Sequence, residues 1–333
     1  MNSSSLRGCS LAFLFLSAVS VHAADPWPFP SKNAPTAASA REGEGDFEIG
    51  PEYAEAPELK RRDNVPHGAV QEFTMNSADS KIYPGLNGAY TRKCAVYIPE
   101  QYTPGKPAPF IVVQDGMGYV KRLTTALDNL IADKKLPAIV AVFLDSGGGD
   151  GKGSERGLEY DTLSDRYTNF VETEVLPRIT KDYKVSFTKD PEGRATMGCS
   201  SGAACAFTMA WFRPDLYRRV LSYSGTYVDQ QSPEDPALPD GAWSYHKQLI
   251  PDSTAKPIRI WLHVSENDNR ANDPESTLHN WVMANQRMAA ALKAKGYHYR
   301  YVFSKASRHC DGRVIGQTLP EALLWLWRGY AVK

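Results

Sequence analysis

Gly198-Cys199-Ser200-Ser201-Gly202 stands between a short apolar segment, Arg194 to Met197, and a longer run of small and apolar residues, Ala203 to Ala210. The order glycine, serine, glycine is typical of a sharp turn between a strand and a helix, where small residues are needed because the two elements pass close together. A serine at the tip of such a turn is presented to a substrate. The stretch therefore predicts a strand, a tight turn and a helix, with Ser200 as a nucleophile.

Short segments rich in β-branched residues lie on both sides of this turn, and helical patterns separate most of them. The segments predicted as parallel strands are 110–113, 138–144, 194–198, 220–224, 258–264 and 299–304. Two earlier segments, 70–73 and 92–98, are predicted as antiparallel edge strands. Strands that alternate with helices form a sheet covered on both faces. We therefore expect a single α/β domain with a doubly wound, mostly parallel sheet and antiparallel N-terminal strands.

An acid and a histidine follow later strands in the order that this kind of site requires. A serine hydroxyl is a weak nucleophile near neutral pH, so it needs a histidine base that a carboxylate orients. The turn Ser265-Glu266-Asn267-Asp268 and the residue His309 each follow a predicted parallel strand, where open α/β sheets place their ligands. We predict a triad of Ser200, Asp268 and His309. Glu266 stays open as the rival acid.

The oxyanion of a tetrahedral intermediate needs N–H donors from two places. One comes from the residue after the nucleophile, which is Ser201, and the other from the loop after an early strand. In this chain that loop contains Gly116 and Met117, and the sequence leaves the choice between them open. The predicted mechanism involves no cofactor and no metal.

Two of the cysteines directly adjoin predicted catalytic residues, Cys199 beside Ser200 and Cys310 beside His309. If serine and imidazole are in contact, the neighbouring backbones approach the ~5.5–6 Å Cα separation of a disulfide. We therefore predict a Cys199–Cys310 bond, with two unpaired buried thiols as the alternative. The other cysteines after residue 23, Cys94 and Cys205, are expected to pack as small apolar groups.

The N-terminal part of the chain differs in composition from the rest. Residues 1–23 have the basic start, apolar middle and small-residue end of a secretory signal, which predicts an exported protein, periplasmic or extracellular. Residues 24–65 are rich in Pro, Ala, Glu and Gly and predict a linker or N-terminal extension. The aromatic residues Trp27, Phe29, Phe47 and Tyr53 of this segment are alternatively candidates to dock on the domain. Residues 66–333 are expected to form the catalytic domain.

The charge of the chain is balanced, with 38 basic and 38 acidic residues. Removal of residues 1–23 takes away one cation, Arg7, and leaves a net charge of about −1. This balance predicts no nucleic-acid partner and no anionic membrane surface. No later segment reaches the ~20 apolar residues of a membrane span. The expected partner is an ester substrate, and nothing in the sequence specifies an oligomeric state.

From about Val65 to Lys333 the chain resembles the enterochelin-esterase-like branch of the α/β-hydrolases, the putative esterase family that also contains feruloyl and acetylxylan esterases. The resemblance rests on Val96-Tyr97-Ile98-Pro99, Gln114-Asp115-Gly116, Arg156 to Tyr160, Gly198 to Gly202, Glu266-Asn267-Asp268, His309 and Leu323 to Trp327. It implies an α/β-hydrolase fold, a triad of Ser200, Asp268 and His309, and hydrolysis of a carboxylic ester through an acyl-enzyme. The cysteines beside the triad are also similar to the bridged triad of tannase-type feruloyl esterases, whose large lid domain this chain has no room for.

Four functions remain in competition at this point. The first is a secreted serine esterase acting on an aromatic or acetyl ester of a polysaccharide. The alternatives are a siderophore trilactone esterase, an acyltransferase that passes the acyl group to an alcohol, and a non-catalytic hydrolase-like binding protein. Many relatives place an aromatic residue soon after the histidine, where this chain has Asp311-Gly312-Arg313-Val314-Ile315, so the resemblance does not assign the acyl group.

Overall fold

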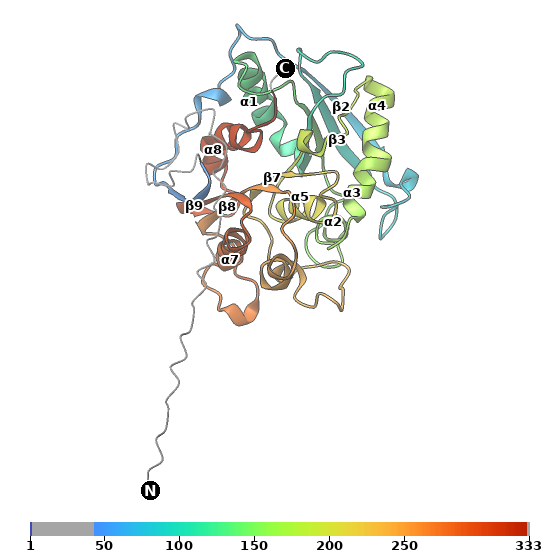
Figure 1. The fold of residues 1–333 in the computed structure, drawn as a ribbon. Helices are drawn as coiled ribbons and strands as arrows, with labels where there is room; N and C mark the ends of the chain where they lie inside the picture. The colour runs from blue at the N-terminus through green and yellow to red at the C-terminus, as the bar shows by residue number, and fades with distance from the viewer. Residues whose placement is uncertain (2–42, 332–333) are drawn as a thin grey trace.

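A mixed sheet of nine strands forms the centre of the computed structural model, which describes residues 43–331 together with Met1 (Figure 1). The strands lie in the order β1-β9-β8-β7-β6-β4-β5-β3-β2. In this spatial order, every pair of neighbouring strands from β1 across the sheet to β5 is parallel. Strand β3 is antiparallel to both of its neighbours, β5 and β2. The strands are β1 (Gly45–Ile49), β2 (Ala69–Asn76), β3 (Thr91–Ile98), β4 (Phe110–Gln114), β5 (Val140–Leu144), β6 (Arg194–Cys199), β7 (Arg219–Tyr223), β8 (Arg259–Asn267) and β9 (His298–Arg308).

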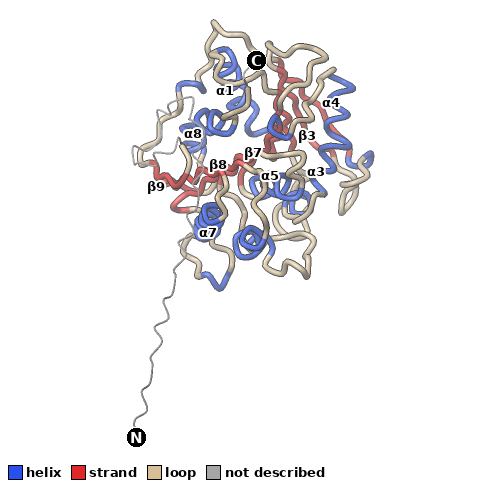
Figure 2. Tube along the Cα trace, in the orientation of Figure 1, coloured by secondary structure: helices blue, strands red, loops and turns tan. Residues whose placement is uncertain are grey.

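Helices cover both faces of this sheet (Figure 2). They are α1 (Val120–Ala132), α2 (Glu155–Tyr160), α3 (Arg166–Phe170), α4 (Leu176–Tyr183), α5 (Ser201–Phe212), α6 (Ile250–Asp252), α7 (Trp281–Ala294) and α8 (Gly312–Leu326), with π-helical turns at Val171–Val175 and Tyr245–Leu249. Short 3-10 turns occupy Pro57–Leu59, Ser77–Asp79, Gly116–Tyr119, Pro191–Gly193, Gly241–Trp243 and Glu275–Thr277. Within the described residues, no helix combines the length and apolar character that crossing a bilayer requires.

The core is divided into two layers by the sheet, as the period of a strand requires. Ile111 and Val113 of β4 belong to the apolar cluster that contains α1 and α8, and Val112 belongs to the cluster that contains α3 to α5 and α7. Successive side chains of a strand point to opposite faces, so a strand buried on both faces is apolar throughout. The doubly wound α/β fold expected from the sequence is therefore confirmed.

Strand β1 lies inside the segment 24–65 that was predicted as a linker or extension. It pairs in parallel with β9, from Gly45 opposite Arg300 to Ile49 opposite Ser304, and Phe47 is buried. The domain therefore starts before residue 66, because this apolar strand covers the edge of β9. The predicted signal peptide, residues 1–23, and residues 24–42 lie outside the described residues.

Three further strand predictions need correction. The segment 92–98 is not an edge strand, since β3 lies between β5 and β2 and its residues Cys94 to Tyr97 are buried on both faces. Strands β8 and β9 also run further than predicted, to Asn267 and Arg308, with an irregular register between Ser265 and Asn267. The acid and histidine loops consequently begin directly at the carboxyl ends of two neighbouring strands.

Candidate active site

Ser200 occupies the tight turn between β6 and α5. Its backbone has φ 58° and ψ −130°, a strained conformation for a residue with a side chain. A Cβ on Gly198 would lie 2.3 Å from the carbonyl carbon of Gly202, and a Cβ on Gly202 would lie 3.1 Å from the Cβ of Gln114. The strand and the helix thus pass too close for a larger residue at Gly198. This close approach explains why the sequence pattern has glycine at that position.

The Ser200 hydroxyl is turned toward Thr226. Its Oγ lies 3.3 Å from Thr226 Oγ1, and the Thr226 N–H donates to the Ser200 carbonyl at 3.2 Å. Among the described residues the structure gives no hydrogen bond between Ser200 and His309. In free enzymes such bonds are often long and tighten only around a substrate.

His309 and Asp268 form a close pair. His309 Nδ1 lies 2.5 Å from Asp268 Oδ1, which makes Nδ1 the donor and leaves Nε2 as an acceptor in the neutral ring. The Asp268 side chain is fully buried and also accepts hydrogen bonds from the Ser224 hydroxyl at 2.7 Å and the Asn269 N–H at 2.8 Å. Burial opposes ionisation, but the bonds from His309 and Ser224 outweigh it and lower the pKa of Asp268. The pair can therefore hold a proton on the imidazole.

Glu266, the rival acid, faces another direction. Its Oε2 accepts the N–H of Ala306 at 2.8 Å, and its Oε1 lies 3.7 Å from Lys305 Nζ. Glu266 belongs to strand β8 itself and not to the turn after it. Of the two acids left open by the sequence, Asp268 is the one in contact with His309.

A disulfide joins the serine turn to the histidine loop. Cys199 and Cys310 are bonded, with their Cα atoms 6.1 Å apart. The Cys310 N–H donates to the Ser224 hydroxyl at 3.1 Å, the same hydroxyl that donates to Asp268. The covalent bond and this hydrogen bond fix the His309 loop beside Ser200. Cys94 and Cys205 are buried free thiols, as expected.

In the loop after β4, the N–H groups of Gly116 and Met117, the two candidates for the second oxyanion donor, have different hydrogen-bond partners. The Met117 N–H is already used, because it donates to Asp145 Oδ1 at 3.1 Å. The structure gives the Gly116 N–H no partner among the described residues, and a Cβ there would lie 2.6 Å from the Cα of Phe143. The loop therefore favours Gly116 over Met117 as the second donor.

Two side chains that the sequence did not indicate hold Ser201. The amide nitrogen of Gln230 lies 3.2 Å from Ser201 Oγ and donates to Asp161 Oδ2 at 2.7 Å. Asp161 is 3% exposed, and burial raises its pKa to about 6. No sequence motif identifies these residues, or Ser224 and Thr226. Each of them contributes to the site through a hydrogen bond to a residue that is distant in the sequence.

Arg156 fixes the loop that carries Gly116. Its guanidinium donates to Asp115 Oδ2 at 2.8 Å and to Asp150 Oδ1 at 2.7 Å, and it stacks on the Tyr160 ring at 5.2 Å. Asp115 has a left-handed backbone with φ 49°, so this clamp holds a strained residue directly before Gly116. Arg156 belongs to the segment on which the family resemblance rests.

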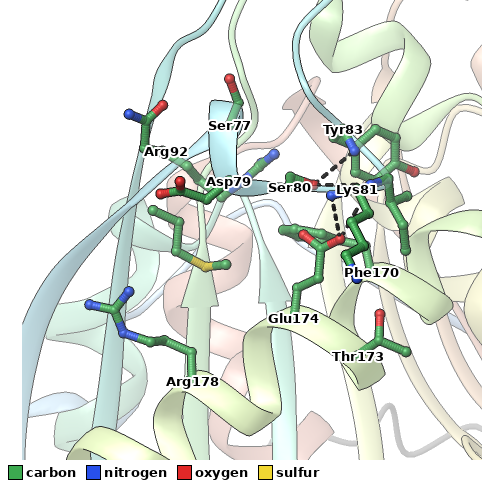
Figure 3. A pocket seen from close by; sticks show the side chains of 13 residues that line it. Ser77, Asp79, Ser80, Lys81, Tyr83, Arg92, Phe170, Thr173, Glu174 and Arg178 are labelled. Atoms are coloured by element: carbon green, nitrogen blue, oxygen red, sulfur yellow. Dashed lines mark hydrogen bonds between the residues drawn. The ribbon is translucent and has the colours of Figure 1, made fainter.

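A cavity of about 640 Å³ lies elsewhere, between β2, β3 and the π-helical turn Val171–Val175 (Figure 3). Its wall includes Glu174, which accepts the N–H groups of Lys81 and Ile82 at 3.0 and 3.2 Å. Figure 3 shows the side chain of Glu174 directed toward Lys81. None of the residues that line it belongs to the predicted catalytic site. The cavity is therefore separate from the residues that the sequence predicts to be catalytic.

Comparison with known proteins points to one family. Residues 89–324 match the model of the family described as "Putative esterase". No curated protein matches the chain.

Solved structures of esterases share the fold. A ferric enterobactin esterase from Salmonella typhimurium has a TM-score of 0.57 and 19% identity, over 78% of this chain and 58% of that one. A ferulic acid esterase from Anaeromyces mucronatus has a TM-score of 0.59 and 14% identity, over 83% and 96%. Another ferulic acid esterase has a TM-score of 0.58 and 20% identity, over 79% and 98%. The chain thus spans about three fifths of the length of the enterobactin esterase.

Proposed function

Because this chain belongs to the family described as "Putative esterase", we propose that it is a serine esterase that hydrolyses a carboxylic ester through an acyl-enzyme. The observation that carries the proposal is the pair formed by His309 and the buried Asp268, which a disulfide holds beside the strained Ser200 turn. An aspartate that orients a histidine next to such a serine is the arrangement that nucleophilic acyl transfer requires.

In the proposed mechanism, Ser200 Oγ attacks the ester carbonyl and passes its proton to His309 Nε2. Asp268 stabilises the imidazolium through Nδ1. The oxyanion accepts hydrogen bonds from the N–H groups of Ser201 and Gly116. The imidazolium then protonates the leaving alcohol, and a water activated by the same histidine releases the acid and restores Ser200.

For the substrate we propose an aromatic or acetyl ester on a polysaccharide. The support is the match in length, since the chain spans 96–98% of two ferulic acid esterases but only 58–61% of the enterobactin esterases. An enzyme for a siderophore trilactone is the second candidate. The two candidates differ in product, because one releases ferulate or acetate from a sugar and the other linearises a cyclic ester.

A fluorophosphonate probe and a substrate panel test this function. Wild type is expected to be labelled and Ser200→Ala is not, whereas Ser276→Ala, an exposed serine, should label like wild type. The panel consists of p-nitrophenyl acetate, methyl ferulate and a siderophore ester, each with and without a sugar acceptor. Transfer of the acyl group to the sugar would favour an acyltransferase. An unlabelled wild type with no turnover would identify a binding protein and overturn the proposal.

We also propose that residues 1–23 direct export and that the mature chain begins at Ala24. The Cys199–Cys310 disulfide supports this, since such bonds persist in oxidising compartments. Terminal sequencing of the protein recovered from the periplasm or medium should read from Ala24. Recovery of the full chain from the cytoplasm alone would contradict it.

A further inference from the structure

Helix α7 begins beside His309. The helix lies against β8 and β9 (Figure 1), and its first residue, Trp281, packs on the imidazole of His309. The two ring centroids are 6.2 Å apart and the ring planes stand at 87°, which is an edge-to-face arrangement that aromatic rings prefer. The proposed mechanism assigns no role to Trp281.

The imidazole of His309 needs a second restraint. Among the described residues its hydrogen bond is the one from Nδ1 to Asp268, and its side chain is 23% exposed. One hydrogen bond fixes Nδ1 but allows the ring to tilt about that contact, and Nε2 lies on the far side of the ring. Since Nε2 has to take the proton of Ser200, its position depends on what packs against the ring. A small misplacement of a reacting group costs a large factor in rate.

Trp281 is itself held firmly, because the start of α7 is bonded to the turn after β8. The Trp281 N–H donates to the carbonyl of Asn269 at 3.2 Å. The preceding residue, Asn280, donates through Nδ2 to the carbonyls of Ala271 and Asp273 at 2.8 and 2.9 Å. The indole that contacts the imidazole is therefore fixed relative to the turn that carries the acid.

Asn285, one helical turn further on, joins α7 to the loop after β7. Its Nδ2 donates to the carbonyls of Trp281 and Gly225 at 2.9 and 2.8 Å. Gly225 stands between Ser224 and Thr226, which contact the acid and the nucleophile. Asn285 is fully buried, and its Oδ1 has no hydrogen-bond partner among the described residues. An unpaired buried acceptor is unfavourable, and an apolar residue would avoid it but could not bond the Gly225 loop.

The indole of Trp281 shows the same conflict with packing alone. Trp281 is 7% exposed, and its Nε1–H has no acceptor within residues 43–331. A buried indole N–H usually finds a partner, and a purely apolar side chain would fill the space without this cost. We propose that Trp281 is a positioning residue whose ring holds the imidazole of His309 in the orientation that presents Nε2 to Ser200. This inference rests on the esterase function proposed for Ser200 and His309.

Steady-state hydrolysis of p-nitrophenyl acetate is the first test. Trp281→Leu is expected to lower kcat at least about tenfold with KM within about twofold of wild type, because the base is misplaced and substrate binding is not. Trp281→Phe keeps an aromatic ring against the imidazole and should retain kcat within about threefold. Trp327→Leu is the matched control, since this indole is 3% exposed and packs on Arg219 at the other end of the strands. It should lose stability and keep kcat within about twofold.

Proton NMR gives a readout that does not depend on turnover. A proton that an imidazole Nδ1 donates to a buried carboxylate resonates far downfield and is seen only while the pair is ordered. Its loss or upfield shift in Asp268→Asn identifies the signal. Wild type, Trp281→Phe and Trp327→Leu should show it, whereas Trp281→Leu should broaden or lose it. If Trp281→Leu does not fold, Trp281→Met replaces it, because methionine fills irregular space but presents no ring.

An unchanged kcat in Trp281→Leu, or a fall in kcat with the downfield signal intact, would overturn this role of Trp281. Failure of Trp281→Phe to recover both kcat and the signal would also rule out the ring contact as the cause. If no variant, wild type included, hydrolyses an ester but the signal still depends on Trp281, the proposed function fails and the contact that orders His309 stands.

Discussion

At the residue scale, the candidate site depends on a short chain of hydrogen bonds. Ser224 donates to Asp268, Asp268 accepts from His309, and the same Ser224 hydroxyl accepts from the Cys310 backbone. One serine hydroxyl thus supports both the carboxylate and the loop of the base. Apart from His309, the hydrogen-bond donors to Asp268 among the described residues are neutral, namely the Ser224 hydroxyl and the N–H groups of Ser265 and Asn269.

Mutation of Asp268 and Glu266, the two acids considered for the triad, tests which of them orients His309. Asp268→Asn removes the acceptor that sets the tautomer of His309, so kcat should fall by about 10³–10⁴-fold with little change in fold. Glu266→Gln should keep kcat within about twofold, because Glu266 contacts Ala306 and Lys305 instead. Hydrolysis of p-nitrophenyl acetate measures both. A reversed order of the two effects would show that the wrong acid has been assigned.

Ser224→Ala tests the support of that carboxylate. Loss of a hydrogen bond to a buried charge costs about 1.5–3 kcal/mol, so kcat/KM should fall about tenfold to a hundredfold. Ser224→Thr, which retains a hydroxyl, is expected to recover part of the loss. If Ser224→Ala has wild-type kcat/KM at neutral pH, the hydrogen bond to Asp268 has no catalytic importance.

Asp161 predicts a pH dependence of stability. Its pKa is raised by burial to about 6, so the folded state binds a proton more tightly than the unfolded state does. Its contribution to the free energy of unfolding should therefore decrease as pH rises from about 4 to about 6, by up to about 3 kcal/mol. Urea unfolding of Asp161→Asn should lack this slope relative to wild type, while Asp63→Asn, an exposed aspartate, should retain it.

At the element scale, the turn β6–α5 and the loop after β9 are the two parts that must stay together. They come from positions 111 residues apart, and neighbouring strands place them at the same edge of the sheet. The disulfide and the Ser224 contact then limit their relative movement. Precision at the site therefore depends on elements that are rigid and on one covalent link between their loops.

The double variant Cys199→Ser, Cys310→Ser should be less stable than wild type. A bond that closes a loop of this length stabilises a protein by up to about 4–5 kcal/mol in the chain-entropy model. We expect a lower Tm and a reduced kcat, because the histidine loop gains freedom. Added dithiothreitol should affect wild type and not the double variant. An unchanged Tm in the double variant would mean that packing alone holds the loop.

At the scale of the whole molecule, the N-terminal strand completes the sheet. β1 covers β9, Phe47 lies against the Arg300 guanidinium at 4.0 Å from its carbon to the ring centroid, and Tyr53 donates to the carbonyl of Lys305. Arg300 also pairs with Glu321 of α8. This edge is therefore tied to β9, the strand that ends directly before His309.

Phe47→Ala should destabilise the protein by about 3–5 kcal/mol, as truncation of a buried aromatic ring does. Val70→Ala, at a position that is 37% exposed on edge strand β2, should change the free energy of unfolding by less than about 0.5 kcal/mol. Denaturant unfolding measures both. Equal stabilities of the two variants would show that β1 adds little to the domain.

The sequence by itself determined the alternation of strands and helices, the serine turn and the neighbourhood of acid and histidine. These follow from local rules, since apolar periodicity and the need for glycine at a close contact depend on residues near one another in the chain. The features that the sequence did not predict also have a physical explanation. The strand Gly45–Ile49 looked like part of a linker because its partner, β9, lies about 250 residues away.

Only the tertiary structure decided between Asp268 and Glu266, or showed that the Met117 N–H is occupied by Asp145. It also brought Asp161 and Gln230 to Ser201. Each of these depends on which side chains meet after the sheet has assembled. Contacts between distant residues are set by packing and register, and no short segment of sequence contains that information.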